Sequence, residues 1–279
     1  TSTQADYGYE YAETFDSKLV PVTWEAVDPS SYAVDKVGQK FTVNGKVTYA
    51  GKEHPATAEI TVAEPAAAGT SNSSVTFENV QLKDEFWLPK QETNATASLN
   101  KAITEIEKAS GGEPNFDNAI KKLNGESYDA FSGFVFQDSD FSKWIEAVGY
   151  SLTQHPDPKL EAIADGAIDI VCAAQQDDGY LDTYYIINGK DKIFTNLKDH
   201  HELYCMGHLI EGAVAYYEAT GKDKLLKAAA RFADYAAAHF GPEEGKCKGY
   251  PGHEIAEMAL VRLYEVTKEP KYLELSKFF

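Results

Sequence analysis

Three side chains with metal-binding or acid–base chemistry line one face of a single predicted helix. In HHELYCMGHLIEGAVAYY, residues 200–217, His201, Cys205 and His208 follow one another at i, i+4 and i+7, so they share a narrow sector. This spacing could bind zinc, but a structural zinc site takes four ligands and no fourth is obvious nearby. We therefore favour the interpretation that Cys205 and His208 pack against a neighbouring helix with their hydrogen bonds satisfied.

Two histidines occupy equivalent places in front of helical segments. His201 begins its helix after a polar loop, and His253 follows a Pro-Gly turn in GYPGHEIAEMAL. An imidazole at a helix start can donate a hydrogen bond to a ligand hydroxyl, or it can serve as a local cap. Because the two lie at equivalent ends of successive helices, we expect them to converge on one mouth of the fold and to bind a ligand there.

The loops that precede the helices are rich in aromatic, amide and acidic side chains. In GFVFQDSDFSKW, Phe136 and Gln137 combine a flat apolar face with a polar head, a pairing that suits a sugar ring. Asp138 and Asp140 either join that site or, together with Ser139, cap the helix that follows, with Ser139 or Asp140 at the N-cap. The loop AQQDDGYLDTYY has the same character. Such loops predict a neutral, polyhydroxylated ligand, which is a carbohydrate.

The first part of the chain is predicted to be strand-rich. Up to about Val62 the apolar residues alternate with a period of two, as at Val20, Val22 and Trp24. Asn-Gly at Asn44 is a turn signal between two such runs. We therefore expect short antiparallel strands over residues 1–63.

The remainder of the chain is predicted to be helical. Small polar residues in AEPAAAGTSNSS predict a linker over residues 64–75. Beyond it, similar helix–turn–helix stretches begin near Gly149, Tyr216 and Leu263. Repetition of this kind predicts stacked helix pairs over residues 76–279, in an open solenoid or a closed α/α toroid. The long polar loops favour the toroid.

Composition excludes several classes of partner. The net charge of −18 argues against nucleic acid, whose phosphates require Lys and Arg. The sequence has neither a basic amphipathic helix nor an apolar run of bilayer length, so we expect no membrane span, and no signal peptide is visible in the chain. The three cysteines form no CxxC pair and are odd in number, which argues against a disulfide framework.

Several motifs in this order resemble glycoside hydrolase family 127, the β-L-arabinofuranosidase family. They are VQLKDEFWLPKQETN, FVFQDSDFSKWIEA, QQDDGYLDTYY, HELYCMGHLIEGAVAYYEATG, FGPEEGK, PGHEIAEMALVRLYE and KYLELSKFF. The resemblance spans about residues 76–279. Residues 1–63 resemble a bacterial Ig-like β-sandwich without a clear first strand, so we expect a module that is truncated at its N-terminus.

The resemblance implies an (α/α)6 barrel, present here only in part because the chain has too few helices to close it. It implies retaining hydrolysis by a cysteine thiolate held on zinc, with a separate glutamate as acid/base. Cys172, Cys205 and Cys247 are scattered and match no part of that centre. We therefore expect the catalytic residues and zinc ligands to lie outside this chain, which would be inactive alone.

The residues that the resemblance carries over are those of sugar binding. It implies that His201 and His253 bind the sugar in subsite −1. More weakly, it implies that the loop from Phe136 through Gln137 and Asp138 to Asp140 forms the wall of the pocket. The expected ligand is an L-arabinofuranose-containing plant glycan or glycoprotein, and the expected location is extracellular or at the bacterial cell surface.

Two other classes of function stay open at the level of the residues. One is another α/α-toroid glycosidase or lyase, in which Asp178 and Glu202 perform the acid–base chemistry. The other is a non-catalytic carbohydrate-binding or cell-surface protein built mainly around the Ig-like module. The sequence indicates neither the oligomeric state nor the linkage that is recognised.

Overall fold

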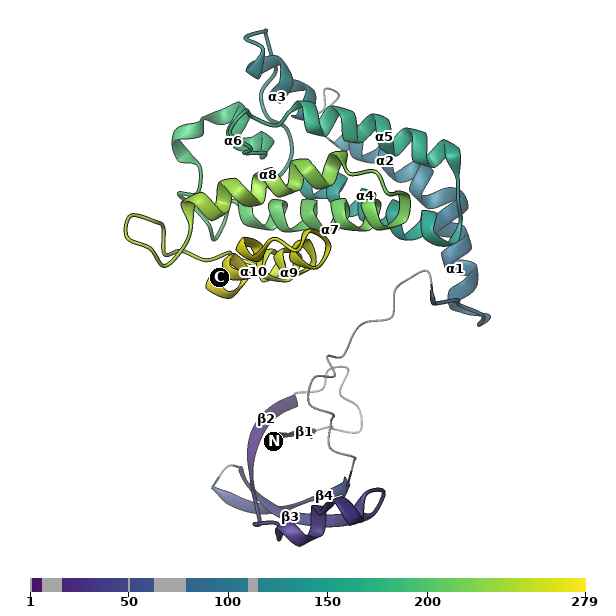
Figure 1. The fold of residues 1–279 in the computed structure, drawn as a ribbon, viewed down its shortest axis with the longest axis vertical. Coiled ribbons are helices and arrows are strands. Elements are labelled where there is room, and N and C mark those ends of the chain that lie inside the picture. Colours follow the sequence, from purple (N-terminus) through teal and green to yellow (C-terminus); the bar gives the residue numbers. More distant parts are fainter. Residues whose placement is uncertain (1, 7–16, 50, 63–78, 110–114) are drawn as a thin grey trace. The chain divides into compact units, whose positions relative to one another are not determined.

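The computed structural model describes residues 2–6, 17–49, 51–62, 79–109 and 115–279 of the 279-residue chain. The chain divides into two compact units, Thr1–Ser74 and Val75–Phe279, each of which is described by itself (Figure 1). The predicted linker at 64–75 lies outside the described residues.

The first unit is an antiparallel meander of four strands in the order β1-β2-β3-β4. Alternating side chains of β3, among them Val43 and Val47, are buried on one face. The all-β character that we expected is present, but the described residues form one sheet, and the second sheet of an Ig-like sandwich is not among them. The strands and the short 3₁₀ turns between them are β1 Ser2–Asp6, β2 Ser17–Trp24, η1 Pro29–Tyr32, η2 Val34–Lys36, β3 Lys40–Tyr49 and β4 Lys52–Thr61.

The turn predicted at Asn44 is wrong. Asn44 and Gly45 lie inside β3, and Gly45 pairs with Trp24 of β2. A Cβ atom on Gly45 would come within 2.6 Å of Cε3 of Trp24, so the glycine makes room for an indole that lies over the backbone. The reversal between β3 and β4 instead uses Gly51, whose φ of 75° suits a glycine.

The second unit is helical. Its elements are α1 Trp87–Thr93, the π-helical segment η4 Asn94–Ser98, α2 Leu99–Ala109, α3 Asn115–Leu123, α4 Asp138–Gln154, α5 Pro158–Ala173, α6 Thr183–Asn188, the 3₁₀ turn η5 Lys190–Lys192, α7 Glu202–Thr220, α8 Lys224–His239, α9 Ile255–Thr267 and α10 Pro270–Phe278.

Three helical hairpins, α4–α5, α7–α8 and α9–α10, build most of this unit (Figure 1). Their first helices pack side by side in the order α4, α7, α9, and the second helices contact one another in the order α5, α8, α10. The repeated hairpin predicted from the sequence is therefore confirmed. Its two layers are the arrangement of an α/α toroid, here as an arc.

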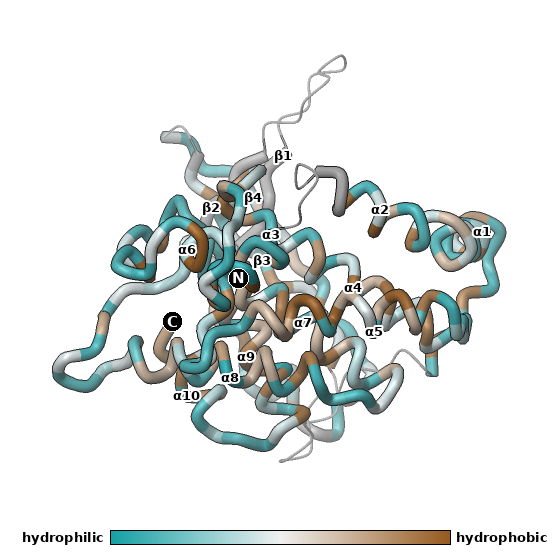
Figure 2. The backbone as a smooth tube through the Cα atoms, turned by 90° about the horizontal axis from the view of Figure 1, so that it is seen from above, coloured by the Kyte–Doolittle hydropathy of each residue, from teal (hydrophilic) through white to brown (hydrophobic). Residues whose placement is uncertain are grey.

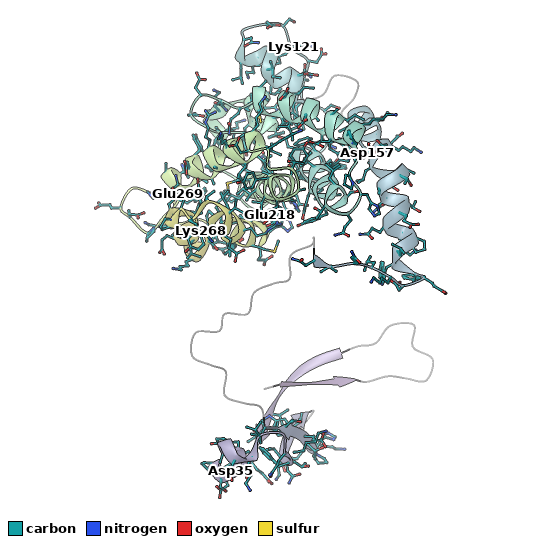
Figure 3. The ribbon with its side chains drawn as sticks, turned by 45° about the vertical axis from the view of Figure 1, so that its right-hand side comes forward. Asp35, Lys121, Asp157, Glu218, Lys268 and Glu269 are labelled. Atoms are coloured by element: carbon teal, nitrogen blue, oxygen red, sulfur yellow. The ribbon has the colours of Figure 1, made fainter. Side chains whose placement is uncertain are left out.

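Local capping explains where these hairpins turn. Asp157 begins α5 by accepting hydrogen bonds from the backbone N–H of Lys159 at 2.9 Å and of Leu160 at 3.3 Å. Lys268 ends α9 in the left-handed conformation, and Glu269 precedes the proline that opens α10. Figure 3 labels Asp157, Lys268 and Glu269 at these ends.

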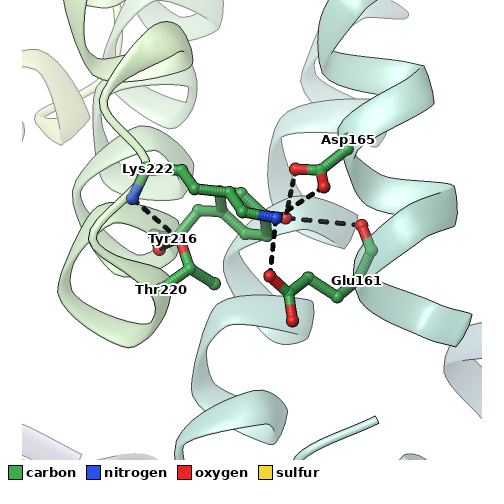
Figure 4. Close-up of polar contacts among 5 residues, drawn as sticks. All are labelled: Glu161, Asp165, Tyr216, Thr220 and Lys222. Carbon is green, nitrogen blue, oxygen red and sulfur yellow. Dashed lines mark hydrogen bonds and ion pairs between the residues drawn. The ribbon is translucent and has the colours of Figure 1, made fainter. Parts of the chain in front are cut away.

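A polar cluster ties the α7–α8 turn to α5 (Figure 4). The Tyr216 hydroxyl donates to Oδ1 of Asp165 at 2.8 Å. The Lys222 ammonium lies 2.6 Å from Oδ2 of Asp165 and 2.6 Å from Oε1 of Glu161. These contacts fix the position of α7 relative to the outer layer.

α7 is apolar almost all round because it is enclosed by α4, α8 and α9. Figure 2 shows hydrophobic stretches along α4 and α7. The two helices approach closely at glycines: a Cβ atom on Gly212 would lie 2.6 Å from the Ser142 carbonyl oxygen, and one on Gly149 would lie 2.7 Å from that of Ala215. Among the described residues, no helix has the length and apolar character needed to cross a membrane.

Candidate functional site

His201 and His253 meet at one end of the α4–α7–α9 layer. Their Nε2 atoms are 3.0 Å apart and their ring centroids are 4.9 Å apart. His201 precedes α7 with a left-handed backbone at φ 61° and makes no capping hydrogen bond with its side chain. Residue Glu254, not His253, is the N-cap of α9. The two imidazoles therefore converge as expected. His201 occupies the N-cap position of α7, but its side chain makes no capping hydrogen bond, and His253 lies before the N-cap residue of α9.

The backbone fixes the hydrogen-bonding roles of this pair. Nδ1 of His201 lies 2.7 Å from the carbonyl oxygen of Asp199. A carbonyl oxygen only accepts, so Nδ1 of His201 carries a proton and donates it. In the neutral ring Nε2 is then bare, and it accepts the Nε2–H of His253. His201 thus presents an acceptor and His253 a donor, whereas helix-start histidines in the sequence suggest two donors.

Aromatic rings form a wall beside the histidines. The ring of Phe136 lies 5.2 Å from that of His201, and Phe134 stacks on Phe136 in parallel at a centroid distance of 5.2 Å. The Tyr204 ring is 5.6 Å from His201, 5.1 Å from His253 and 6.5 Å from Phe136. Phe134 is 69 % exposed, so the wall continues outward to the surface.

The remaining residues of the predicted loop support this wall or lie away from it. Gln137 donates to the Asp140 carboxylate and accepts from the backbone N–H of Phe134 at 3.3 Å. Asp138 uses both carboxylate oxygens on Thr183, taking its backbone N–H at 2.7 Å and its hydroxyl. Burial raises the pKa of Asp138 to about 6. Asp138 therefore joins the starts of α4 and α6, and its oxygens are occupied there.

A layer of neutral and positive groups lies beneath the histidines. Lys143 of α4 donates to the Tyr204 hydroxyl at 2.7 Å and to the Ser139 hydroxyl at 3.1 Å. The Tyr204 ring packs edge-on against His208 at 4.5 Å. Burial, aided by the charge of Lys143, lowers the pKa of His208 to about 4, so its ring is neutral near pH 7.

The expectation that His208 has satisfied hydrogen bonds is wrong in part. Its Nδ1 is buried without a partner among the described residues. Cys205 is buried, as expected, and burial raises the pKa of its thiol. Across the described part of the chain, no group of three or more His, Cys, Asp or Glu side chains could hold a metal ion. The helical spacing of His201, Cys205 and His208 therefore does not make a zinc site.

The family model described as "Beta-L-arabinofuranosidase, GH127 catalytic domain" matches residues 79–279. This chain belongs to glycoside hydrolase family 127.

Individual members of the family are similar over the same part of the chain. A non-reducing end β-L-arabinofuranosidase from Bifidobacterium longum subsp. longum is 48 % identical over 163 residues, which are 57 % of this chain and 25 % of that protein. The crystal structure of a GH127 β-L-arabinofuranosidase from Geobacillus stearothermophilus T6 superposes with a TM-score of 0.64 at 46 % identity, covering 72 % of this chain and 32 % of that one.

A second solved GH127 β-arabinofuranosidase has a TM-score of 0.66 at 37 % identity, covering 73 % of this chain and 33 % of its own. The chain thus spans about a quarter of the length of the curated relative and about a third of the length of each of these two structures.

The zinc that the family resemblance implies does not fit the cysteines of this chain. The Cys172 sulfur lies 3.9 Å from the Lys224 carbonyl oxygen, and the Cys247 sulfur accepts from the backbone N–H of Gly249 at 3.4 Å. Cys205 is enclosed between α7 and α4. Each of the three therefore has its own surroundings, and none is part of a metal-binding group in the described residues.

Sequence reasoning missed the role of Glu202. The sequence suggests it, with Asp178, as acid/base in an alternative glycosidase. Its carboxylate is fully buried and accepts from the Tyr180 hydroxyl at 2.6 Å and from the backbone N–H of Phe194 at 2.9 and 3.1 Å. Asp178 separately accepts from the backbone N–H of Tyr180 at 3.1 Å. The one available signal was a carboxylate at the start of an apolar helix.

Proposed function

We propose that the protein is a β-L-arabinofuranosidase-like glycoside hydrolase in which the helical unit of this chain supplies the sugar-binding wall of the active site. The observation that carries the proposal is the His201–His253 pair, with one acceptor and one donor beside the Phe136 ring. Membership of family 127 supports it independently. The similarity to β-L-arabinofuranosidases supports an L-arabinofuranose unit as the bound sugar.

The chemistry of the pair suits a sugar hydroxyl. In the free protein the two imidazoles satisfy one another with a single hydrogen bond. A sugar hydroxyl is both donor and acceptor, so it can donate to Nε2 of His201 while it, or a neighbouring oxygen of the sugar, accepts from Nε2 of His253. The ligand therefore replaces one hydrogen bond with two. The face of Phe136 packs against the C–H side of the sugar ring.

Bond cleavage itself is proposed to need residues outside these 279. The resemblance implies retaining hydrolysis with a cysteine nucleophile on zinc and a glutamate acid/base, and we assign none of these roles here. The 279-residue chain alone is accordingly expected to release no nitrophenol from a nitrophenyl β-L-arabinofuranoside. Measurable turnover by the purified chain would contradict this assignment.

The setting of the enzyme is part of the same proposal. We propose that it acts on plant-type glycans or glycoproteins outside the bacterial cell, with residues 1–63 as an Ig-like accessory module. The support is the strand meander of the first unit and the acidic net charge of −18, which suits a neutral ligand better than an anionic one.

The test is direct binding of methyl β-L-arabinofuranoside, with methyl β-L-arabinopyranoside as the matched control. Both have the same composition, so a preference for the furanoside reports ring shape and hydroxyl placement. Binding is followed through the imidazole signals of ¹⁵N-histidine-labelled protein. We expect the furanoside to shift the signals of His201 and His253. Binding that leaves the imidazole signals of both residues unchanged would contradict the assignment of the histidine pair to the site.

A further inference from the structure

The loop between α6 and α7 is closed by the first residue of the helix that follows it. Glu202 reaches back to Phe194, whose backbone N–H donates to both carboxylate oxygens, at 2.9 and 3.1 Å. The Tyr180 hydroxyl holds the same carboxylate at 2.6 Å. Glu202 and Tyr180 are fully buried and Phe194 is 5 % exposed, so water does not compete for these bonds.

The closed loop has an unfavourable backbone at both of its ends. Phe194 has φ 58° and His201 has φ 61°, the left-handed region that residues with a side chain rarely adopt. Such conformations persist only where the surroundings determine them. The carboxylate of Glu202 binds the amide of one strained residue, and Glu202 directly follows the other in the chain.

The inside of the loop sets the tautomer of His201. The side-chain oxygen of Asn196 accepts from the backbone N–H of Asp199 at 3.0 Å, which fixes the last turn of the loop. The carbonyl oxygen of Asp199 then faces Nδ1 of His201 at 2.7 Å. The acceptor role of Nε2 in His201 therefore depends on the shape of the loop.

The outside of the same loop supports His253. A Cβ atom on Gly252 would lie 2.8 Å from the carbonyl oxygen of Lys198 and 3.0 Å from that of Leu197, so the two backbones are in direct contact. One on Gly249 would lie 2.5 Å from Cδ1 of Leu197. His253 is the next residue after Gly252. The bend of the loop thus forms the surface on which the second histidine is placed.

We propose that Glu202 is a positioning residue that fixes both imidazoles of the His201–His253 pair by closing the loop at 194–202, although its carboxylate contacts neither of them. It orders His201 from within the loop and His253 through the packing of Lys198 on Gly252. The geometric claim does not depend on the ligand; only its consequence for sugar binding rests on the proposed function.

The test compares Glu202→Gln with Glu211→Gln in the intact protein. Both glutamates are buried on α7, but Glu211 pairs with Arg262 and is not part of the loop. The side-chain amide introduced by Glu202→Gln offers one oxygen where the carboxylate offers two. We expect the backbone amide of Phe194 to exchange its hydrogen about 10- to 100-fold faster in Glu202→Gln, from the loss of a buried hydrogen bond. We also expect His201 to lose its fixed tautomer in ¹⁵N spectra.

Glu211→Gln is expected to lower the melting temperature while leaving both readouts as in the wild type. If Glu202→Gln leaves the tautomer of His201 and the exchange of Phe194 unchanged, the positioning role is wrong, even where the protein is less stable.

A second variant, Gly252→Ala, keeps the proposal testable if Glu202→Gln does not fold. It leaves the bonds of Glu202 intact and disturbs only the packing of Lys198 on the segment before His253. We expect it to shift the imidazole signals of His253 and to leave the exchange of Phe194 unchanged. Unchanged His253 signals would overturn the claim that the loop places the second histidine.

A titration with the sugar distinguishes a failure of the positioning role of Glu202 from a failure of the proposed function. We expect Glu202→Gln to weaken binding of methyl β-L-arabinofuranoside about tenfold, as expected for one misplaced hydrogen bond, and Glu211→Gln to leave it unchanged. If the wild type binds no furanoside, the proposed function fails, while the tautomer and exchange measurements still decide the positioning role.

Discussion

Two polar clusters of the α4–α7–α9 layer, one just before the starts of α7 and α9 and one further along the helices, differ in how their members are paired. At the mouth, His201 and His253 have each other as partners across 3.0 Å. Further along the helices, Arg262 of α9 donates to Glu211 and Glu218 of α7 and to Tyr150 of α4, the last two at 3.1 and 2.9 Å. The mouth holds two imidazole rings joined by one hydrogen bond, and the lower cluster holds opposite charges that bind one another.

This difference distinguishes the proposed ligand site from a structural cluster. The Arg262 side chain is 23 % exposed and its guanidinium has three oxygen partners on two helices, so a ligand would have to displace strong, charge-assisted bonds. In the proposed site, the imidazole pair gives up only one hydrogen bond when a sugar hydroxyl enters. We therefore infer that the Arg262 cluster serves stability through its charge-assisted bonds, and that the more exposed histidine pair, which is held by one hydrogen bond, is available for recognition.

The strongest way to test the comparison is to break the lower cluster. Arg262→Ala leaves Glu211, with a side chain 5 % exposed, as a buried carboxylate without its ion-pair partner. We expect a loss of about 3–5 kcal/mol in the free energy of unfolding, measured by urea denaturation. Sugar binding by the folded fraction should be unchanged.

The matched control is Lys271→Ala, which removes a partly exposed ion pair with Asp234. Because solvent screens that pair, the expected loss is about 0–1 kcal/mol. Equal losses for the two variants would contradict the conclusion that the Arg262 cluster stabilises the inner layer more than an exposed ion pair does.

The contributions of Glu202 and His208, both on α7, to the free energy of unfolding should depend on pH with opposite signs. Burial raises the pKa of Glu202 from 4.5 to about 7, so the folded state binds the proton more tightly than the unfolded chain. Its contribution is present below pH 4.5 and is lost between about pH 4.5 and 7. His208 is the reverse: its pKa falls from 6.5 to about 4, so its contribution is present above pH 6.5 and is lost as the pH falls towards 4.

The measurement is the free energy of unfolding of the wild type, Glu202→Gln and His208→Phe from about pH 4 to 8, which spans both titrations. Glu202→Gln should flatten the loss on the alkaline side, and His208→Phe should flatten the loss on the acid side. Profiles that remain parallel to the wild type in both variants would show that neither group titrates as its burial implies.

Substitution of either histidine of the pair should lower the affinity for the sugar and leave the stability of the protein almost unchanged. His201→Ala and His253→Ala each leave a sugar oxygen without its partner, at a cost of about 1–3 kcal/mol, or roughly a tenfold to hundredfold weaker binding. The melting temperature should change little because both rings lie at the mouth. His208→Ala should do the opposite, lowering stability and sparing affinity. Wild-type affinity in both mouth variants would disprove the pocket.

Whether a feature could be predicted from the sequence depends on how far apart in the chain the interacting residues lie. The hairpins at α4–α5, α7–α8 and α9–α10 were predictable because periodicity and turn residues are local signals. The meeting of His201 and His253 was predictable from their equivalent places before two helices. The strand through Gly45 was not, because the indole that covers the glycine comes from another strand.

The roles within the site were beyond the sequence for the same reason. The donor–acceptor order of the histidines depends on the Asp199 carbonyl, and the position of that carbonyl depends on two left-handed residues that no propensity predicts. Asp138 was expected in the pocket wall, yet its oxygens are bound to Thr183, which is 45 residues away in the chain. Glu202 has the sequence setting of an acid–base residue, but its contacts are those of an anchor.

The smallest effect on sugar affinity is expected from a substitution in the aromatic wall beside the histidine pair. Phe136→Leu keeps an apolar side chain of similar size but removes the flat face that lies 5.2 Å from the His201 ring. Aromatic packing is worth about 0.5–1.5 kcal/mol beyond the burial of area, so affinity for methyl β-L-arabinofuranoside should fall by roughly 2- to 12-fold. The tautomer of His201 should be unchanged, because the Asp199 carbonyl sets it and the ring of Phe136 does not. A loss as large as that of His201→Ala, accompanied by a change of tautomer, would mean that Phe136 orients the imidazole and is not itself a surface for the sugar.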